Sequence, residues 1–184
     1  KLSDGNLIEA VLIPTVDRIT VCISSQVGCS LSCKFCATGY LTRMRNLEAS
    51  EIYDQVVLMR KEAAKHFDRP LTNIVYMGMG EPLLNYKNVK ESIHHITSPE
   101  GLNMASKRIT VSTAGIAKMI RKLGDDEVKF NLALSLHAAN DAKRNEIMPI
   151  NESNTLSELG SALDYFYEKT KSKFTLEYII FNEV

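Results

Sequence analysis

Residues 28–39 read Gly-Cys-Ser-Leu-Ser-Cys-Lys-Phe-Cys-Ala-Thr-Gly and place Cys29, Cys33 and Cys36 in a C-x3-C-x2-C spacing. Three thiolates this close together can bind one face of a cuboidal iron–sulfur cluster and leave its fourth iron without a protein ligand. Structural iron–sulfur sites usually use four cysteines. A set of three therefore suggests that the remaining iron meets a substrate or cosubstrate.

All four cysteines of the chain lie between residues 22 and 36, and Cys22 is the one outside this spacing. A disulfide framework joins distant segments, which cysteines so close together cannot do. Thiols that bind a cofactor in a reducing compartment fit this distribution better. A cytoplasmic location is therefore expected.

The composition indicates an ordinary globular protein: 184 residues, about one domain in length, 45% hydrophobic and 24% charged. The 22 basic and 22 acidic side chains cancel, so the overall charge does not point to nucleic-acid binding. Paired basic residues such as Lys107 and Arg108 are more often a solvated helix face than a binding patch. No apolar stretch approaches a membrane span, and the first residues do not resemble a signal peptide. Because the sequence starts on Lys1 and stops just after a strand-like run, it is expected to be part of a longer protein.

Strand-like and helix-like segments alternate along the chain. Apolar runs at 7–13 and 18–24 flank the turn-like residues 14–17 and predict a β-hairpin. Further strands are predicted at 73–77, 108–112, 129–136 and 173–181, and helices at 47–65, 88–97, 116–123 (closed by Gly124) and 156–170, with a short helix after residue 141. Near-continuous apolar strands separated by helices are typical of a parallel sheet with covering helices. The prediction is one incomplete α/β domain, in which residues 1–17 form the first hairpin strand and turn and residues 18–184 form the core.

Polar or glycine-rich residues follow each predicted strand of this sheet. In β/α barrels the chemistry lies at the carboxyl ends of the strands. Here those ends carry the cysteine loop and residues 80–82, 112–115, 135–137 and 182–183. Loops are polar in any protein, so the prediction of a site at this edge depends on the cysteine loop lying there too.

A structural zinc site is the main alternative for the cysteine loop. Zinc normally takes four protein ligands, often with a second Cys/His pair. Apart from Cys22 no cysteine remains, and the four histidines lack zinc-finger spacing, although His137 could approach in space. Zinc is therefore less favoured than an iron–sulfur cluster.

The cysteine loop resembles the signature of radical S-adenosylmethionine (SAM) enzymes, with the aromatic Phe35 just before the last cysteine. Longer strings narrow the resemblance: SSQVGC at 24–29, MGMGEPLLN at 77–85, RITVSTAG at 108–115, SLHA at 135–138 and MPIN at 148–151. Together they are similar to the dual-specificity RNA adenine methyltransferases of the RlmN/Cfr type, from about residue 7 to the end. The fold that this implies is a partial (β/α)6 radical SAM barrel, truncated after about the fifth strand and preceded by the β-hairpin.

The resemblance implies a [4Fe-4S] cluster held by Cys29, Cys33 and Cys36, with SAM chelating the open iron through its amino and carboxylate groups. The positions that match the family's SAM contacts are Gly80, Glu81, Ser112, Ser135, Leu136 and His137. Taken singly, several have an ordinary structural interpretation: Ser112 as a turn cap, His137 as a satisfied loop histidine and Glu81 as a solvated carboxylate. The cluster motif beside them favours SAM binding.

The predicted hairpin brings together a carboxylate and a thiol. A four-residue loop at 14–17 places Ile13 opposite Arg18 and therefore Glu9 opposite Cys22, as cross-strand neighbours. A slip of one residue would separate them, and the commoner situation is an exposed Glu on an edge strand and a small buried Cys. The resemblance implies that Glu9 is the general base that removes the adenine ring proton. It also implies that Cys22 forms a transient disulfide with a second, methyl-carrying cysteine.

The activity implied by the resemblance is methyl transfer to an adenine carbon of large-subunit ribosomal RNA and certain tRNAs, through a methylcysteine and a 5′-deoxyadenosyl radical. The expected partners are these RNAs and an electron donor such as flavodoxin, with no membrane, and the intact protein is expected to be a monomer. None of the four cysteines matches the methyl-carrying one, so the chain alone is expected to be inactive in methyl transfer. C2 is the commoner target in the family and C8 stays open. Two alternatives also stay open: another radical SAM reaction on the same barrel, and a non-enzymatic zinc-binding or RNA-binding module.

Overall fold

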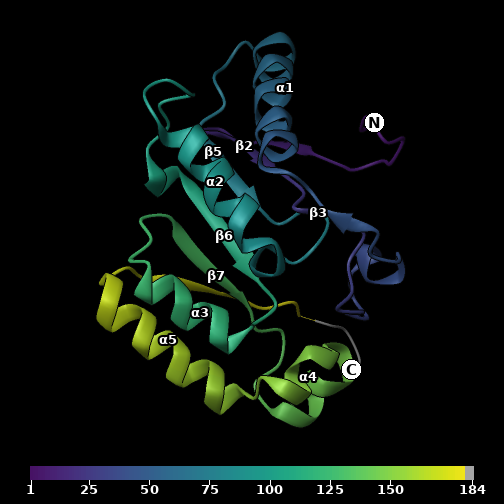
Figure 1. Ribbon diagram of the computed structural model, residues 1–184, viewed down its shortest axis with the longest axis vertical. Coiled ribbons are helices and arrows are strands. Elements are labelled where there is room, and N and C mark those ends of the chain that lie inside the picture. Colours follow the sequence, from purple (N-terminus) through teal and green to yellow (C-terminus); the bar gives the residue numbers. More distant parts are fainter. Residues whose placement is uncertain (181–184) are drawn as a thin grey trace.

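Residues 1–180 are described by the structure, a computed structural model, and the strands within them form one main sheet. The order of its six strands is β1-β2-β5-β6-β7-β8 (Figure 1). β1 is antiparallel to β2, and every later neighbouring pair is parallel. The strands are β1 Val11–Pro14, β2 Ile19–Cys22, β5 Asn73–Tyr76, β6 Ile109–Thr113, β7 Asn131–Ser135 and β8 Phe174–Glu177. The sequence predicted this arrangement of an antiparallel hairpin and five parallel strands, in which β2 belongs to both.

Helices connect the parallel strands and cover the sheet on one face. Each crossover leads to the next strand in the same direction, so right-handed connections place the helices on the same side, as Figure 1 shows for α2, α3 and α5. The α-helices are α1 Ala49–Phe67, α2 Tyr86–Thr97, α3 Ala117–Asp125, α4 Asp141–Ile147 and α5 Leu156–Thr170. Short 3-10 helices occupy η1 Ala37–Tyr40, η2 Pro82–Asn85, η3 Ser106–Arg108 and η4 Pro149–Ser153.

Local sequence signals explain why α5 has the predicted bounds. Thr155 and Glu158 form a capping box, in which the Thr155 N–H donates to the Glu158 carboxylate at 2.8 Å. The helix ends where Lys171 adopts a left-handed conformation with φ 54°. Between these ends the buried face of α5 consists of Leu159, Ala162, Leu163 and Phe166. The cap and the apolar period act together, so the sequence defines both ends of this helix.

The two faces of the sheet differ in burial. In β2 the side chains of Ile19 and Val21 are fully buried under the helices, whereas Thr20 and Cys22, which point the other way, are only partly buried. β5 shows the same alternation, with Ile74 and Tyr76 buried. The face without helices therefore stays partly open, which leaves room for a cavity there.

Gly124 was predicted to close the helix at 116–123, and that prediction is wrong. α3 continues to Asp125, and Glu127 is the residue with the left-handed conformation, at φ 45°. Gly124 is instead a buried contact between α3 and α5, where a Cβ would lie 3.2 Å from Tyr165 Cδ1 and 3.4 Å from Phe166 Cα. The missing side chain is what lets the two helices pack closely.

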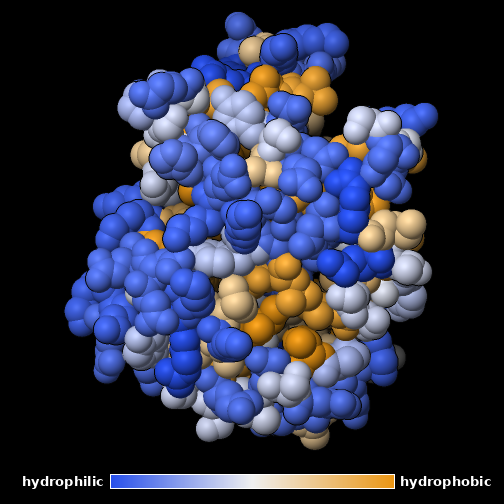
Figure 2. All heavy atoms as spheres, viewed as in Figure 1, coloured by the Kyte–Doolittle hydropathy of each residue, from blue (hydrophilic) through white to orange (hydrophobic). Residues whose placement is uncertain are grey.

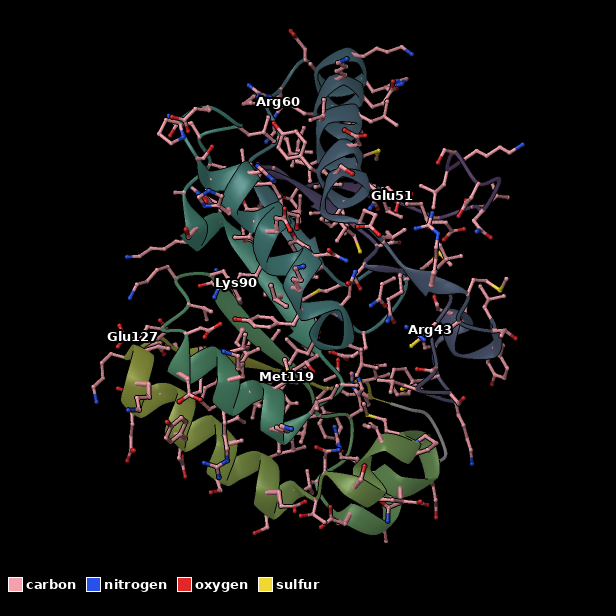
Figure 3. The ribbon with its side chains drawn as sticks, viewed as in Figure 1. Arg43, Glu51, Arg60, Lys90, Met119 and Glu127 are labelled. Atoms are coloured by element: carbon pink, nitrogen blue, oxygen red, sulfur yellow. The ribbon has the colours of Figure 1, made fainter. Side chains whose placement is uncertain are left out.

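Charged side chains hold α2 against α3 on the solvent side. Lys90, labelled in Figure 3, and Lys122 each place their ammonium group 2.7 Å from the Asp126 carboxylate, and the Tyr86 hydroxyl donates to the same carboxylate at 2.6 Å. Figure 2 shows that this face is mostly hydrophilic, with a hydrophobic area between α2 and α3. Among the described residues, no helix combines the length and the apolar character that a membrane crossing requires.

Gly124→Leu is expected to lower the free energy of unfolding by about 1–3 kcal/mol, because the added side chain overpacks the α3–α5 contact. Gly160→Leu is the matched control, since Gly160 is an exposed position of α5 with nothing within 4 Å of an added Cβ. That control should leave stability unchanged or raised, because Leu favours helix more than Gly does. Urea unfolding monitored by circular dichroism measures both, and equal effects of the two substitutions would contradict this account.

Candidate active site

A cavity of about 200 Å³ lies at the carboxyl edge of the parallel sheet. Residues from the cysteine loop and from the ends of β5, β6, β7 and β8 all line it. Of the residues predicted from sequence, those that line it are Cys29, Cys33, Cys36, Gly80, Glu81, Ser112 and Ser135. The expectation that the cysteine loop and the polar strand ends share one edge is therefore met by the geometry.

The cysteine loop is closed by a small ladder that sequence reasoning missed. β3 (Gln26–Val27) pairs antiparallel with β4 (Arg45–Asn46), so the chain enters and leaves the loop side by side. Gly28 has φ +73°, and a Cβ there would overlap the carbonyl oxygen of Thr42. Two-residue strands carry almost no sequence pattern, which explains why only the structure reveals this closure.

Arg45 joins the loop to the start of α1. Its guanidinium donates to the Glu51 carboxylate at 2.7 and 2.8 Å, and its Nε donates to Asp4 at 2.6 Å. In Figure 3, Glu51 lies at the base of α1, and Arg43 lies on the loop below it. These contacts are partly exposed, so they orient the loop more than they stabilise it.

The three thiols are not arranged around a single point. Among residues 1–180 no group of three or more His, Cys, Asp or Glu side chains is arranged to hold one metal ion. A cuboidal cluster instead binds each thiolate through a different iron, so its ligands stand further apart. Burial, then the neighbouring Cys29 and Cys36, raise the pKa of the Cys33 thiol to about 12. Burial also raises the pKa of Cys29, so cationic iron is needed to hold these groups as thiolates.

Glu81 is buried and connects two strand ends. Its carboxylate accepts from the backbone N–H of Leu83 at 3.0 Å and from that of Ala114 at 2.7 Å, and burial raises its pKa. The backbone N–H of Glu81 in turn donates to Gln26 Oε1 at 2.9 Å. The preceding Gly80, at φ +96°, leaves no space for a Cβ beside the Gln26 side chain. Glu81 is thus not the solvated carboxylate of the ordinary interpretation, because it fixes the turn between β5 and η2.

Glu177 is the carboxylate that sequence reasoning missed. It lines the cavity and accepts from the hydroxyls of Ser112 at 3.0 Å and Ser135 at 3.4 Å. The sequence placed the last strand at 173–181, so its polar end was expected at 182–183, which lies outside the described residues. β8 ends at Glu177, where the Glu177 carbonyl accepts from the N–H groups of Leu136 and His137 at 2.9 and 3.2 Å.

His137 and Leu136 do not line the cavity but close its edge. His137 has φ +56°, and its Nδ1 accepts from the Ile179 N–H at 3.2 Å. Its ring meets Phe35 edge-on, with the centroids 4.5 Å apart. Burial lowers the pKa of His137, so the neutral imidazole is favoured. His137 therefore links the cysteine loop to the segment after β8.

The predicted pairing of Glu9 with Cys22 is wrong by two residues. Val11 faces Cys22, because Pro14 belongs to the strand and pairs with Ile19, which moves the turn to residues 15–18. Thr15 closes this turn by donating its N–H to the Arg18 carbonyl at 2.8 Å. Glu9 lies two residues before β1 and is not paired with Cys22; its carbonyl accepts from the Ser24 hydroxyl at 2.7 Å.

Cys22 lies beside the cavity rather than in its lining. The backbone of Met77, which does line the cavity, forms a hydrogen bond to the Cys22 thiol. Burial raises the pKa of this thiol, and the Glu177 carboxylate raises it further. All four cysteines are free thiols in the described chain, so the disulfide expected from the resemblance is not present among them.

The sequence profile of the radical SAM superfamily matches residues 23–182. The chain belongs to the radical SAM superfamily. This membership implies a [4Fe-4S] cluster and SAM as its cofactors. It agrees with the three thiols and the polar strand ends that share one cavity.

Similar proteins extend the match beyond the superfamily profile. The chain is 67% identical over its whole length to the probable dual-specificity RNA methyltransferase RlmN of Cytophaga hutchinsonii, and covers 50% of that protein. It is 60% identical to the protein of the same name from Flavobacterium psychrophilum, and covers 53% of it. A crystal structure of a radical SAM methyltransferase from Sphaerobacter thermophilus superposes with a TM-score of 0.95 at 42% identity, over 99% of this chain and 53% of that one. The resemblance found in the sequence is thereby confirmed, and the chain spans about half the length of the curated relatives it matches.

Glu177→Gln is expected to weaken SAM binding about 10- to 100-fold, because it removes the charge from a hydrogen-bonding carboxylate that faces the radical SAM cavity. Equilibrium dialysis against labelled SAM, with the cluster reconstituted, measures the change. Glu168→Gln, at an exposed position of α5, is the matched control and should bind SAM like the unaltered protein. If the unaltered protein, Glu177→Gln and Glu168→Gln bound SAM with equal affinity, Glu177 would not be a SAM-binding residue.

Gly28→Ala is expected to destabilise the closed cysteine loop by about 1–3 kcal/mol, since it adds a Cβ at positive φ against a backbone carbonyl. Less iron should then be bound after anaerobic reconstitution. Gly5→Ala separates strain from overlap, because Gly5 has φ +89° but nothing within 4 Å of an added Cβ. If Gly28→Ala retained as much iron as Gly5→Ala, the close approach to Thr42 would be irrelevant to the site.

Proposed function

We propose that this chain is the catalytic core of a radical SAM methyltransferase that modifies C2 of an adenine in large-subunit ribosomal RNA and in certain tRNAs. The observation that carries the proposal is the shared cavity, which combines the three thiols with polar groups from the ends of four neighbouring strands. The two RlmN relatives are identical to this chain at most positions, and their names, dual-specificity RNA methyltransferases, support an RNA substrate.

Different residues around the cavity are proposed to hold the cluster, to contact SAM and to support the turn after β5. Cys29, Cys33 and Cys36 would hold the [4Fe-4S] cluster, which when bound supplies an electron to SAM and so gives access to radical chemistry. Ser112, Ser135 and Glu177 offer hydroxyl and carboxylate groups that can receive the polar groups of SAM. Gly80 and Glu81 keep the turn after β5 in place through their contacts with Gln26 and Ala114.

Leu136 and His137 act on the shape of the site. Their N–H groups hold the end of β8, and therefore the backbone of Glu177, against the end of β7. The ring of His137 supports Phe35 between two of the cysteines. In this proposal Leu136 and His137 position other residues that contact SAM. The resemblance implies in addition that Leu136 and His137 contact SAM themselves.

Glu9 and Cys22 are proposed to act on the RNA base. Glu9 is exposed, so its carboxylate is free to accept the proton that leaves the adenine ring. Cys22 faces the helix-free side of the sheet next to Met77. Its thiolate can attack the sulfur of the cysteine that is joined through its methyl carbon to the base, which forms a transient disulfide and breaks the bond between that sulfur and that carbon. The released electron pair stays on the carbon attached to the base, which takes up a proton and becomes the methyl group. The Ser24 hydroxyl, two residues after Cys22, holds the Glu9 carbonyl at 2.7 Å, which supports a site that both residues share.

The substrate must present an unstacked base. An adenine inside a duplex cannot reach a cavity at the end of a sheet, which favours loops of folded RNA over helices. The proposal includes a single-electron donor of the flavodoxin type, a monomeric intact protein and a cytoplasmic location.

Anaerobic assays of the intact protein with SAM, a reductant and unmodified ribosomal RNA test the proposal. Cys33→Ala should lose the cluster, and with it both SAM cleavage and methylation. Glu9→Gln should retain SAM cleavage but form methylated RNA about 10²- to 10⁴-fold more slowly, as expected for the loss of a general base. Cys22→Ala should also cleave SAM but leave the RNA attached to the protein.

Asp17→Asn, an exposed change in the hairpin turn, is the control and should methylate RNA at the unaltered rate. A colourless protein with one bound zinc, or full methylation by Glu9→Gln, would refute the proposal. The 184-residue chain on its own is expected to cleave SAM without methylating RNA, because none of its cysteines matches the methyl-carrying one. Methyl transfer by this chain alone would overturn that part.

A further inference from the structure

Arg144 on α4 is a fully buried cation held mainly by backbone oxygens. Its side chain has 0% exposure and is among the largest buried in the protein. The guanidinium donates to the carbonyls of Ala114 at 2.5 Å, Ser135 at 3.0 Å and Leu136 at 3.0 Å, and to Asn151 Oδ1 at 2.6 Å. Its donors are therefore largely satisfied, but all four acceptors are neutral.

The positive charge of Arg144 lacks a carboxylate partner at ion-pair distance within residues 1–180. Of the two acids on the same helix, Glu146 is exposed, and Asp141 has its Oδ1 occupied by the Asn151 amide and the Leu156 N–H, both at 2.9 Å. A buried charge without a counter-charge carries a large desolvation cost. Hydrogen bonds to carbonyls offset part of this cost, so the charge itself needs an explanation.

The cysteine loop packs against the helix that carries Arg144. The Lys34 N–H, between two of the cluster cysteines, donates to the Ile147 carbonyl at 2.9 Å. The Met148 N–H donates to the Arg144 carbonyl at 2.7 Å, and the Met148 side chain lines the cavity together with Cys33. Burial raises the pKa of Cys33, and the nearby charge of Arg144 acts in the opposite direction and lowers it. Through these contacts Arg144 lies near a residue that becomes a thiolate when the cluster binds.

We propose that Arg144 is the buried counter-charge of the iron–sulfur cluster and raises its reduction potential. The proposal rests on the proposed function only in that the three cysteines hold a [4Fe-4S] cluster. Three thiolates outweigh the positive charge of the oxidised cluster core, and reduction adds a further negative charge. A fixed cation nearby favours the more negative, reduced form, since net charge is one of the factors that set the potential of such clusters.

Burial makes Arg144 effective in a way that exposed cations are not. Lys34 is closer to the cysteines in sequence, but it is exposed to water, which screens its charge. Arg144 acts through a protein interior of lower dielectric constant. The same guanidinium holds the carbonyls at the ends of β6 and β7, so one side chain positions the SAM-binding edge and compensates the cluster.

Redox titration of the intact, anaerobically reconstituted protein without SAM tests the proposal, with the signal of the reduced cluster in electron paramagnetic resonance as the readout. Arg144→Gln should lower the equilibrium constant for one-electron reduction at least about tenfold, equivalent to a shift of about 59 mV to lower potential. Arg144→Lys keeps the charge but loses the planar fork, and should change the constant less than about threefold. Lys34→Gln is the matched control for loss of a charge and should also change it less than about threefold.

These variants separate a charge from a purely structural role. A structural role predicts that Arg144→Lys and Arg144→Gln behave alike, and that result, or an unchanged constant in Arg144→Gln, would overturn the proposal. If Arg144→Gln fails to fold, Asp141→Asn decides, because it removes a competing anion and should raise the constant about twofold, whereas no rise would count against the counter-charge. A protein that binds no cluster at all would refute the proposed function instead.

Discussion

The carboxyl edge of a parallel sheet imposes one constraint on this protein: the backbone leaves the ladder there, and its polar groups need new partners. Buried side chains supply them. The Ser24 hydroxyl donates to the Glu9 carbonyl at 2.7 Å and accepts from the Met79 N–H at 3.0 Å, which joins the hairpin to the turn after β5. Glu81 joins that turn to the end of β6, and Arg144 joins β6 to β7. The ends of β5, β6 and β7 are thus each fixed by a side chain from elsewhere in the chain.

The cysteine loop is organised differently from this edge. It is closed at its base by β3 and β4 and touches the rest of the protein at few points, such as the hydrogen bond from Lys34 to Ile147. Its thiols are close enough to raise the pKa of Cys33, so they oppose one another once ionised. The strand ends are therefore fixed by hydrogen bonds of the protein alone, whereas the thiols of the loop need a bound metal to stay ionised.

Features that depend on residues close together in the sequence could be predicted, whereas features that depend on distant segments could not. The bounds of α5 and the presence of the five parallel strands depend on local caps and apolar periods, so they could be predicted. The spacing of the three cysteines indicates an iron–sulfur cluster, so this site could be predicted too. The hairpin register could not, because Arg69 fixes the turn from a distant segment by donating to the Thr15 and Val16 carbonyls at 2.9 and 3.0 Å. Glu177 was missed for a similar reason: β8 ends there, and the partners of its carbonyl, the N–H groups of Leu136 and His137, come from a segment about forty residues away.

The charges around the cavity explain why it suits SAM. Cys29, Cys33, Cys36 and Glu177 line it, and each is anionic or becomes so when a metal binds. Arg144 is the buried cation near them, and its guanidinium is already engaged with four oxygens. The iron of the cluster offsets the thiolates, but it leaves the Glu177 carboxylate between two serine hydroxyls. A ligand that enters this cavity therefore gains most if it carries positive charge and hydrogen-bonding groups together, and a sulfonium with an ammonium and a ribose has both.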